Sequence, residues 1–180
     1  MILLSDATYW TARFLLYRGL FLTYFLAFLV AWNQFRALAG EDGLTPFPEY
    51  LDSRSFRSCP SLLHFWKSDR AVTRVCGSGL ILSLGGLLGV EWLGSLAVGV
   101  NFLVLWALYL SLVKAGGLFY GYGWESLLCE TGALAAFLGG AHQRVPRVIL
   151  VLFAWLLFRV MFGAGLIKLR GDDCWWNLTC

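Results

Sequence analysis

Charged side chains are scarce in this chain of 180 residues. Asp, Glu, Lys and Arg make up 14% of it, whereas a soluble domain carries about 25%. Hydrophobic residues make up 59% of the chain, and a soluble domain of this length has too little interior to bury so much apolar surface. A lipid bilayer can solvate that surface. We therefore expect one integral membrane domain, with the bilayer as its surroundings.

Other scarcities exclude further classes of protein. The net charge is only +3 and the basic residues are scattered, so no nucleic-acid-binding surface is expected. The five cysteines are too few and too dispersed for a disulfide framework. Neither His64 nor His142 has a second ligand at metal-site spacing. No metal and no other cofactor is therefore expected.

Long apolar runs predict the fold. Because a bilayer core needs about 20 mostly apolar residues per helix, we expect an all-α, polytopic transmembrane helix bundle of about five helices. The predicted helices span residues 14–35, 75–90, 92–113, 123–141 and 145–167. The second and third are separated only by Glu91 and Gly94. They are predicted to form a hairpin, since the combined run is too long for one crossing.

One polar segment, residues 36–74, interrupts this pattern. It contains six basic residues, five acidic residues and three prolines, which predicts a turn-rich loop. Within it, the apolar and aromatic stretch Ser61–Trp66 predicts a short helix lying on the membrane surface. The basic residues divide 4 against 9 between the two sides of the bundle, which points to an outside N-terminus. Acids within a folded loop weaken that rule, so the orientation stays open.

Small residues and cysteines predict local packing. Gly85 and Gly89 form a GxxxG step, and small residues let helix backbones approach closely in lipid. Cys76 and Cys129 lie in apolar runs and are expected to be buried thiols.

Two features near the C-terminus depend on the compartment. Cys174 and Cys180 lie close together among polar residues, and a disulfide there requires an oxidising environment. Asn177 begins an Asn-Leu-Thr sequence that matches the acceptor pattern for N-glycosylation.

Four ionisable residues lie within the apolar runs or at their ends: Glu125, Glu130, Arg159 and Lys168. A charge at the bilayer centre costs about 2.5–3.5 kcal/mol on insertion scales, so such a residue faces the bundle and finds a partner. We expect Glu125 near the interface and Glu130 deeper. Glu130 is the expected partner of Arg159, with Glu125 as the alternative, and Lys168 is expected to snorkel to the interface.

Two neighbours refine this prediction. Trp124 is expected beside Glu125 at the headgroup level, and Gly163 lies one turn after Arg159, where it leaves room for another helix. Three interpretations of the charges stay open: a pair that sets helix register, a polar pocket that binds a client, or a catalytic dyad. The third is the weakest, because no nucleophile, metal cluster or phosphate loop stands nearby.

These residues carry a resemblance to a known family. The segments concerned are Gly123–Ser126, Glu130–Gly132, Leu157–Asp172, Tyr9–Arg13 and Gly40–Pro46. Together they strongly resemble the lipase maturation factor family over essentially the whole chain. The residues of interest in the resembling blocks are Trp124, Glu125, Glu130, Arg159, Gly163, Lys168, Arg170 and Asp172.

The resemblance implies a function and a location. Members of that family are multi-pass proteins of the endoplasmic reticulum membrane that help lipases fold and assemble, and they are not known as enzymes. The chain has a short N-terminus and ends soon after Cys174, whereas the family continues into further helices and a soluble region that carries much of the client contact. We therefore expect the N-terminal transmembrane portion of a longer protein. The short leader would also suit a bacterial relative in a cytoplasmic membrane.

The function expected from this is a chaperone-like, membrane-embedded folding and assembly factor for secreted lipases. Its partners would be the lipid bilayer and client lipase polypeptides. The rival hypotheses are a multi-pass membrane enzyme and a transporter, each using an intramembrane charged site.

Overall fold

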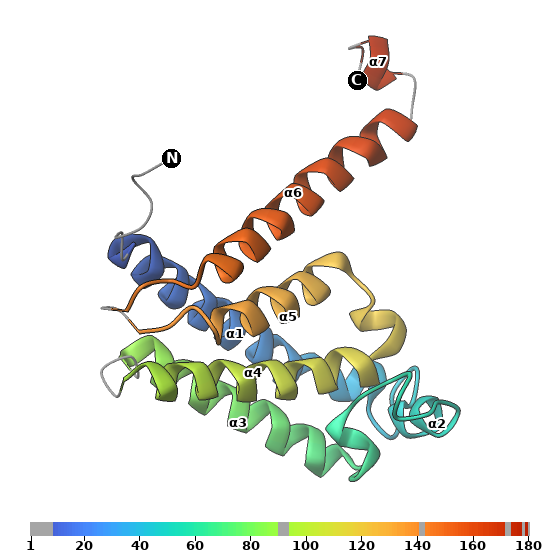
Figure 1. Ribbon diagram of the computed structural model, residues 1–180. Coiled ribbons are helices and arrows are strands. Elements are labelled where there is room, and N and C mark those ends of the chain that lie inside the picture. The colour runs from blue at the N-terminus through green and yellow to red at the C-terminus, as the bar shows by residue number, and fades with distance from the viewer. Residues whose placement is uncertain (1–8, 90–93, 141–142, 172–173, 178, 180) are drawn as a thin grey trace. The chain divides into compact units, whose positions relative to one another are not determined.

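The computed structural model describes residues 9–89, 94–140, 143–171, 174–177 and 179. Every regular element within these ranges is a helix, which confirms the predicted all-α class (Figure 1). The helices are α1 (Trp10–Ala39), α2 (Phe47–Asp52), η1 (Leu62–His64), α3 (Asp69–Leu88), α4 (Ser95–Ala115), η3 (Gly117–Tyr120), α5 (Gly123–Ala135), α6 (Arg147–Arg170) and α7 (Cys174–Asn177). They fall into two compact units, Met1–Arg144 and Val145–Cys180.

Four of these helices are long and apolar enough to cross a membrane: α1, α3, α4 and α6. They correspond to the predicted runs 14–35, 75–90, 92–113 and 145–167. The helix α1 extends about one turn beyond each predicted end, and α3 begins six residues earlier than predicted. Hydropathy missed these ends because they contain charged residues, for example Arg13 and Arg36 of α1, whose side chains find partners in the fold.

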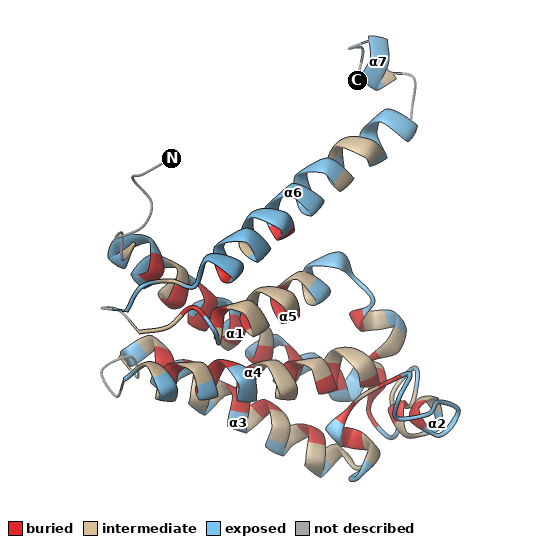
Figure 2. Ribbon diagram, viewed as in Figure 1, coloured by how far each residue is buried: buried red, intermediate tan, exposed pale blue. Residues whose placement is uncertain are grey.

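The first unit is built around α1, which contacts α3, α4 and α5. Two rows of buried side chains follow α1 at seven-residue spacing. One row is Tyr17, Tyr24 and Ala31, and the other is Phe21, Phe28 and Phe35. A seven-residue spacing keeps one seam of a helix facing its neighbours. Figure 2 shows this buried seam in red along α1.

The packing of α3 on α1 depends on two glycines that were not predicted. Gly79 and Gly86 lie against the rings of Phe28 and Phe21, where an added Cβ would overlap the ring atoms. The predicted GxxxG face does not pack within the first unit, because a Cβ at Gly85 would meet no atom within 4 Å. The other member of that pair, Gly89, ends α3 with a φ of 125°. The order of these contacts makes α3 antiparallel to α1.

The helix α4 runs parallel to α1. Its Phe102 stacks on Phe21 at a ring-centroid distance of 4.4 Å, and its Tyr109 meets Phe28 edge-on at 5.4 Å. Since α3 runs the other way, α3 and α4 form the antiparallel hairpin that the sequence predicts. Asn101 of α4 links the two helices by donating from Nδ2 to the carbonyl of Leu82 at 3.2 Å.

The fourth predicted helix is shorter than expected. It was predicted over residues 123–141, whereas α5 ends at Ala135 after 13 residues. At 1.5 Å per residue α5 is about 20 Å long, whereas the hydrocarbon core is about 30 Å thick. The chain continues without regular helix from Ala136 to Gly140. The side chains of Arg13 and Tyr17 stabilise this extension by donating hydrogen bonds to its carbonyls.

The polar loop folds into a compact cap, residues 40–68, over one end of the first unit. Phe47 and Leu51 of α2 are buried, and the Phe47 ring meets Phe35 of α1 at 6.1 Å. An ion pair joins Arg36 to Asp69 at 3.1 Å. The interfacial helix predicted over Ser61–Trp66 is present only as the three-residue η1.

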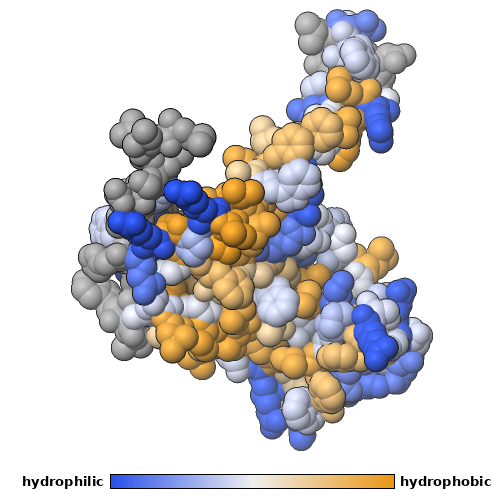
Figure 3. All heavy atoms as spheres, in the orientation of Figure 1, coloured by the Kyte–Doolittle hydropathy of each residue, from blue (hydrophilic) through white to orange (hydrophobic). Residues whose placement is uncertain are grey.

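The outward faces of the long helices are apolar. Exposed examples are Leu15, Leu22, Leu26 and Val30 of α1 and Ile81 and Leu88 of α3. Figure 3 shows hydrophobic side chains over much of the face in view. In water such a surface would drive aggregation. With four candidate spans, it identifies the chain as an integral membrane protein whose outer surface faces lipid.

Candidate functional site

Four polar side chains of the first unit reach α5 or the turn after it. We call this arrangement the α5 seam: the hydrogen bonds that reach α5 and the turn after it from Arg13, Tyr17 and Tyr24 of α1 and from Tyr109 of α4. Interhelical hydrogen bonds of this kind help hold helices together in lipid, where hydrophobic driving force between helices is absent. The seam is therefore the candidate site.

Glu125 lies in the first turn of α5, at one end of the seam. Its Oε2 accepts a hydrogen bond from the Tyr109 hydroxyl, and its Oε1 accepts one from Trp124 Nε1 at 3.1 Å. The ring of Trp124 stacks on Tyr122 at 4.5 Å. A carboxylate in the first turn also interacts favourably with the positive end of the helix dipole. These contacts position Glu125 as an acceptor that anchors the start of α5.

Tyr24 fastens the middle of α5. Its hydroxyl donates to the carbonyl of Leu128 at 3.1 Å, and its ring meets Tyr109 edge-on at 5.9 Å. Gly132 lies directly against that hydroxyl, where an added Cβ would overlap it. The hydrogen bond therefore requires a glycine at position 132.

Arg13 and Tyr17 hold the non-helical turn that follows α5. Tyr17 donates to the carbonyl of Gly139 at 2.8 Å. Arg13 is 3% exposed as a residue, and its guanidinium donates to the carbonyls of Gly140 and Gln143, the latter at 2.7 Å. Irregular backbone within a membrane persists only where protein or water satisfies its polar groups. These two side chains therefore let the chain continue beyond the end of α5.

Sequence reasoning missed Arg13, Tyr17, Tyr24 and Tyr109 as members of a site. Arg13 appears in the sequence analysis only as the end of the segment Tyr9–Arg13, and the three tyrosines are not singled out there. A usable signal was present, since residues 13, 17 and 24 share one helical face. At this spacing, a side chain that ends in a polar group recurs on one face of a mostly apolar helix.

The predicted pairing of Arg159 with Glu130 stays a prediction. Glu130 is half-buried on α5 of the first unit, and Arg159 lies on α6 of the second. Beside Glu130, Thr131 donates from Oγ1 to the carbonyl of Leu127 on its own helix at 2.6 Å. The alternative pairing of Arg159 with Glu125 likewise stays a prediction.

The second unit places the remaining predicted residues on α6 and α7. The Lys168 ammonium lies 4.7 Å from the centroid of the Trp175 ring. Trp176 Nε1 donates to the carbonyl of Leu169 at 3.0 Å, which caps the end of α6. Arg170 is exposed in the last turn of α6, and Asn177 ends α7.

Three other predicted positions complete this unit or lie outside the described residues. A Cβ at Gly163 would meet no atom within 4 Å. Cys174 is disulfide-bonded, whereas Asp172 and Cys180, like His142 of the first unit, lie outside the described residues.

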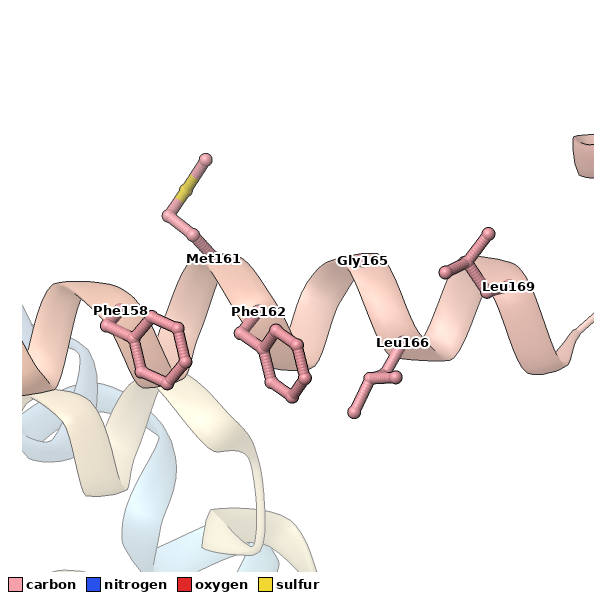
Figure 4. A pocket seen from close by; sticks show the side chains of 6 residues that line it. All are labelled: Phe158, Met161, Phe162, Gly165, Leu166 and Leu169. Atoms are coloured by element: carbon pink, nitrogen blue, oxygen red, sulfur yellow. The ribbon is translucent and has the colours of Figure 1, made fainter.

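A shallow apolar groove runs along α6. The side chains that line it are Phe158, Met161, Phe162, Gly165, Leu166 and Leu169 (Figure 4). They share one face of a single helix, and Gly165 forms the low point between the larger side chains. A groove of carbon and sulfur suits lipid chains or another helix rather than a polar substrate. Among the described residues, no group of three His, Cys, Asp or Glu side chains could hold a metal ion.

The comparison with known families is decisive. The family described as the lipase maturation factor transmembrane domain matches residues 11–180. The chain belongs to the lipase maturation factor family. It is 39% identical to lipase maturation factor 1 of Mus musculus and 40% identical to that of Homo sapiens, and each match covers 98% of this chain and 34% of the relative. Lipase maturation factor 2 of Xenopus tropicalis is 34% identical over 89% of this chain and 25% of its own length.

The chain thus spans about a third of the length of its lipase maturation factor 1 relatives. No solved structure matches it. Three of the segments noted in the sequence, Gly123–Ser126, Glu130–Gly132 and Tyr9–Arg13, contain residues of the α5 seam of this lipase maturation factor domain. Glu125 receives the bonds from Tyr109 and Trp124, and Gly132 accommodates Tyr24.

Proposed function

We propose that this chain is the membrane-embedded part of a folding and assembly factor that assists the maturation of secreted lipases. The observation that carries the proposal is the match of the family's transmembrane domain to residues 11–180. The relatives are named for lipase maturation, and the client class comes from those names. The family match does not favour the rival hypotheses of an enzyme or a transporter.

The role of the domain in this proposal is binding and positioning rather than turnover. Both described partners of the Glu125 carboxylate, Tyr109 and Trp124, are hydrogen-bond donors that fix its orientation. An acid–base catalyst must instead exchange a proton with a substrate within hydrogen-bond reach. The α5 seam therefore acts as a scaffold that holds α5 against α1 and α4.

An endoplasmic reticulum location is the favoured compartment. The names of the relatives support it, and the disulfide of Cys174 agrees with any oxidising compartment, the bacterial periplasm included. On this proposal α7 faces the lumen. The count of basic residues would place the same end in the cytoplasm, but two ion pairs weaken that count. Arg36 pairs with Asp69, and Lys67 pairs with Asp52, so two of the nine basic residues counted on that side are neutralised.

Exchange of domains tests the proposal. This chain would replace the matching third of mouse lipase maturation factor 1, and the chimera would be expressed with a secreted lipase in cells that lack their own maturation factor. We expect the specific activity of the secreted lipase to rise well above that of cells without the chimera. A well-folded chimera that leaves the secreted lipase inactive would contradict the proposal.

The Glu125→Gln variant of the same chimera distinguishes the scaffold proposal from the hypothesis of an enzyme. Gln keeps one acceptor oxygen for Trp124 but replaces the other with a donor, so the bond to Tyr109 remains only if the Tyr109 hydroxyl turns to accept. A scaffold loses activity only in proportion to the loss of folded protein. An enzyme that needs the carboxylate loses all activity while the amount of folded protein stays unchanged. Ser126→Ala, at an exposed position on α5, is the control.

A further inference from the structure

The cap carries exposed aromatic side chains that the α5 seam does not use. Phe56, Phe65 and Trp66 are 48%, 65% and 66% exposed. Their rings nevertheless touch one another, with centroid distances of 5.7 Å between Phe56 and Phe65 and 6.1 Å between Phe65 and Trp66. We call these three residues the aromatic ridge. A soluble surface rarely gathers large rings in this way without a partner.

Hydrogen bonds attach the segment that carries the ridge to one end of the membrane helix α4. Next to the ridge, Ser61 donates from Oγ to the carbonyl of Ser111 at 2.9 Å, and the Leu62 amide donates to Ser111 Oγ at 3.1 Å. Cys59 donates from Sγ to the carbonyl of Lys114 at 3.4 Å. Ser111 and Lys114 lie in the last turns of the membrane helix α4. The segment carrying the ridge is therefore attached where a span ends.

The start of a second membrane helix, α3, places the ridge at the same depth relative to the membrane. Trp66 precedes the first residue of α3, Asp69, by three positions. Lys114, in the last turn of α4, is of the residue type that snorkels to the headgroup region. Tryptophan is enriched at that depth, because its ring is apolar and its indole N–H is polar. Two independent attachments thus place the ridge at the boundary between headgroups and acyl chains.

The charges adjoining the ridge along the chain complement phospholipid. Arg57 follows Phe56 and is exposed, and Lys67, which follows Trp66, is also exposed but pairs with Asp52. Basic side chains next to apolar rings match phosphate groups above acyl chains, as in other interfacial segments. We propose that the aromatic ridge is a lipid-binding surface, which inserts into the headgroup region of a phospholipid bilayer and holds the cap against it.

The depth of a spin label on the ridge tests this proposal. The full chain with Phe65→Cys would be labelled with a nitroxide and reconstituted in phosphatidylcholine vesicles. Collisions with oxygen, which concentrates in lipid, would then be compared with collisions with a water-soluble nickel chelate. Ser53→Cys, an exposed polar position in the same cap, is the matched control. The unsubstituted chain reports any labelling of native thiols.

A lipid-facing ridge predicts that oxygen relaxes the label at position 65 several-fold more strongly than the nickel chelate does, with the reverse order at position 53. Strong relaxation by the chelate at both positions would show a ridge in water and overturn the proposal. Weak relaxation by both reagents would show that protein covers the ridge, and spin–spin broadening would identify that protein as a second copy. Either result also overturns it. Phe56→Cys repeats the measurement at a second ring, in case one variant fails to fold.

Discussion

Gly132 of α5 lies against the phenol of Tyr24 in α1, so closely that no side chain fits between the two helices. The contact brings the Tyr24 hydroxyl to 3.1 Å from the carbonyl of Leu128. Close approach of backbones through a small residue is the general solution to helix packing in lipid. Here the small residue serves a hydrogen bond as well.

Replacing Gly132 with alanine should destabilise the first unit. The new methyl group overlaps the Tyr24 hydroxyl, and overpacking of this kind costs about 1–3 kcal/mol. Thermal unfolding in detergent, followed by near-UV circular dichroism, measures the effect. Gly123→Ala is the matched control on the same helix, since its Cβ would meet no atom within 4 Å. Tyr24→Phe should recover part of the loss in the double variant. Equal stability of the two alanine variants would contradict the packing described here.

Replacing Arg13 with methionine should loosen the turn after α5. The variant loses the hydrogen bonds to the carbonyls of Gly140 and Gln143. Bonds to a charged group contribute about 1.5–3 kcal/mol each, and their loss leaves carbonyls unsatisfied. Amide hydrogen exchange in peptides that contain residues 136–140 should accelerate, whereas exchange in α3 should change little. Arg74→Met, at an exposed position on α3, is the control. Unchanged exchange in residues 136–140 would show that Arg13 does not support the turn.

The pairing of Arg159 with Glu130 can be tested by a double-mutant cycle. If the two side chains form a pair, Glu130→Gln and Arg159→Met should each destabilise the protein, because each leaves a charge alone in lipid. The double variant should then be more stable than the sum of the single effects predicts. Thermal unfolding measures all three. Strict additivity would exclude the pair, and Glu125→Gln in place of Glu130→Gln tests the alternative partner.

The Cys59 thiol should react slowly with alkylating reagents in the folded protein. It is buried in the cap, and burial raises its pKa above the usual value because the thiolate is poorly solvated there. Nearby Lys114 and Arg54 oppose this shift only in part. The thiolate is the reactive form, so labelling at pH 8 should be much slower than in denatured chain and should accelerate only at higher pH. Mass spectrometry of the Cys59 peptide measures the rate, and an introduced Ser53→Cys thiol supplies the exposed reference.

The same shift has a consequence for stability. A thiol whose pKa is raised by folding favours the folded state while it stays protonated. That contribution is fully present below the pKa of the unfolded thiol, about 8.5, and is lost as the pH rises through the folded value. The stability of the cap should therefore fall at alkaline pH, and Cys59→Ala should weaken this dependence. An unchanged alkaline dependence in Cys59→Ala would assign it to another group.

The sequence predicted where the helices lie because hydropathy is a local property. The predicted ends of the runs that became α1, α3, α4 and α6 all lie within six residues of the observed ends. The end of α5 was missed, because residues 136–141 are as apolar as the helix before them. The departure of residues 136–140 from helix depends on Arg13 and Tyr17, which lie more than 100 positions away along the chain and donate hydrogen bonds to carbonyls there.

The glycines that pack against α1 also could not be predicted from one segment of the sequence. Gly85 and Gly89 match a known spacing, but Gly79 and Gly86 are the positions that meet the rings of Phe28 and Phe21. A spacing rule identifies helical faces that could pack, and only the rotation of α3 against α1 selects one of them. Nothing in the sequence of α3 alone sets that rotation.

By itself, the sequence determined that this protein lies in a lipid bilayer, and it determined the family to which the protein belongs. Its apolar runs require lipid, and the blocks around Glu125 and Arg159 carry the family pattern. Only the tertiary structure decided which polar side chains hold the first unit together, namely Arg13, Tyr17, Tyr24 and Tyr109. The physical reason is that a hydrogen bond needs a partner in space. In a membrane that partner belongs to another helix, whose position the hydropathy of one segment cannot specify.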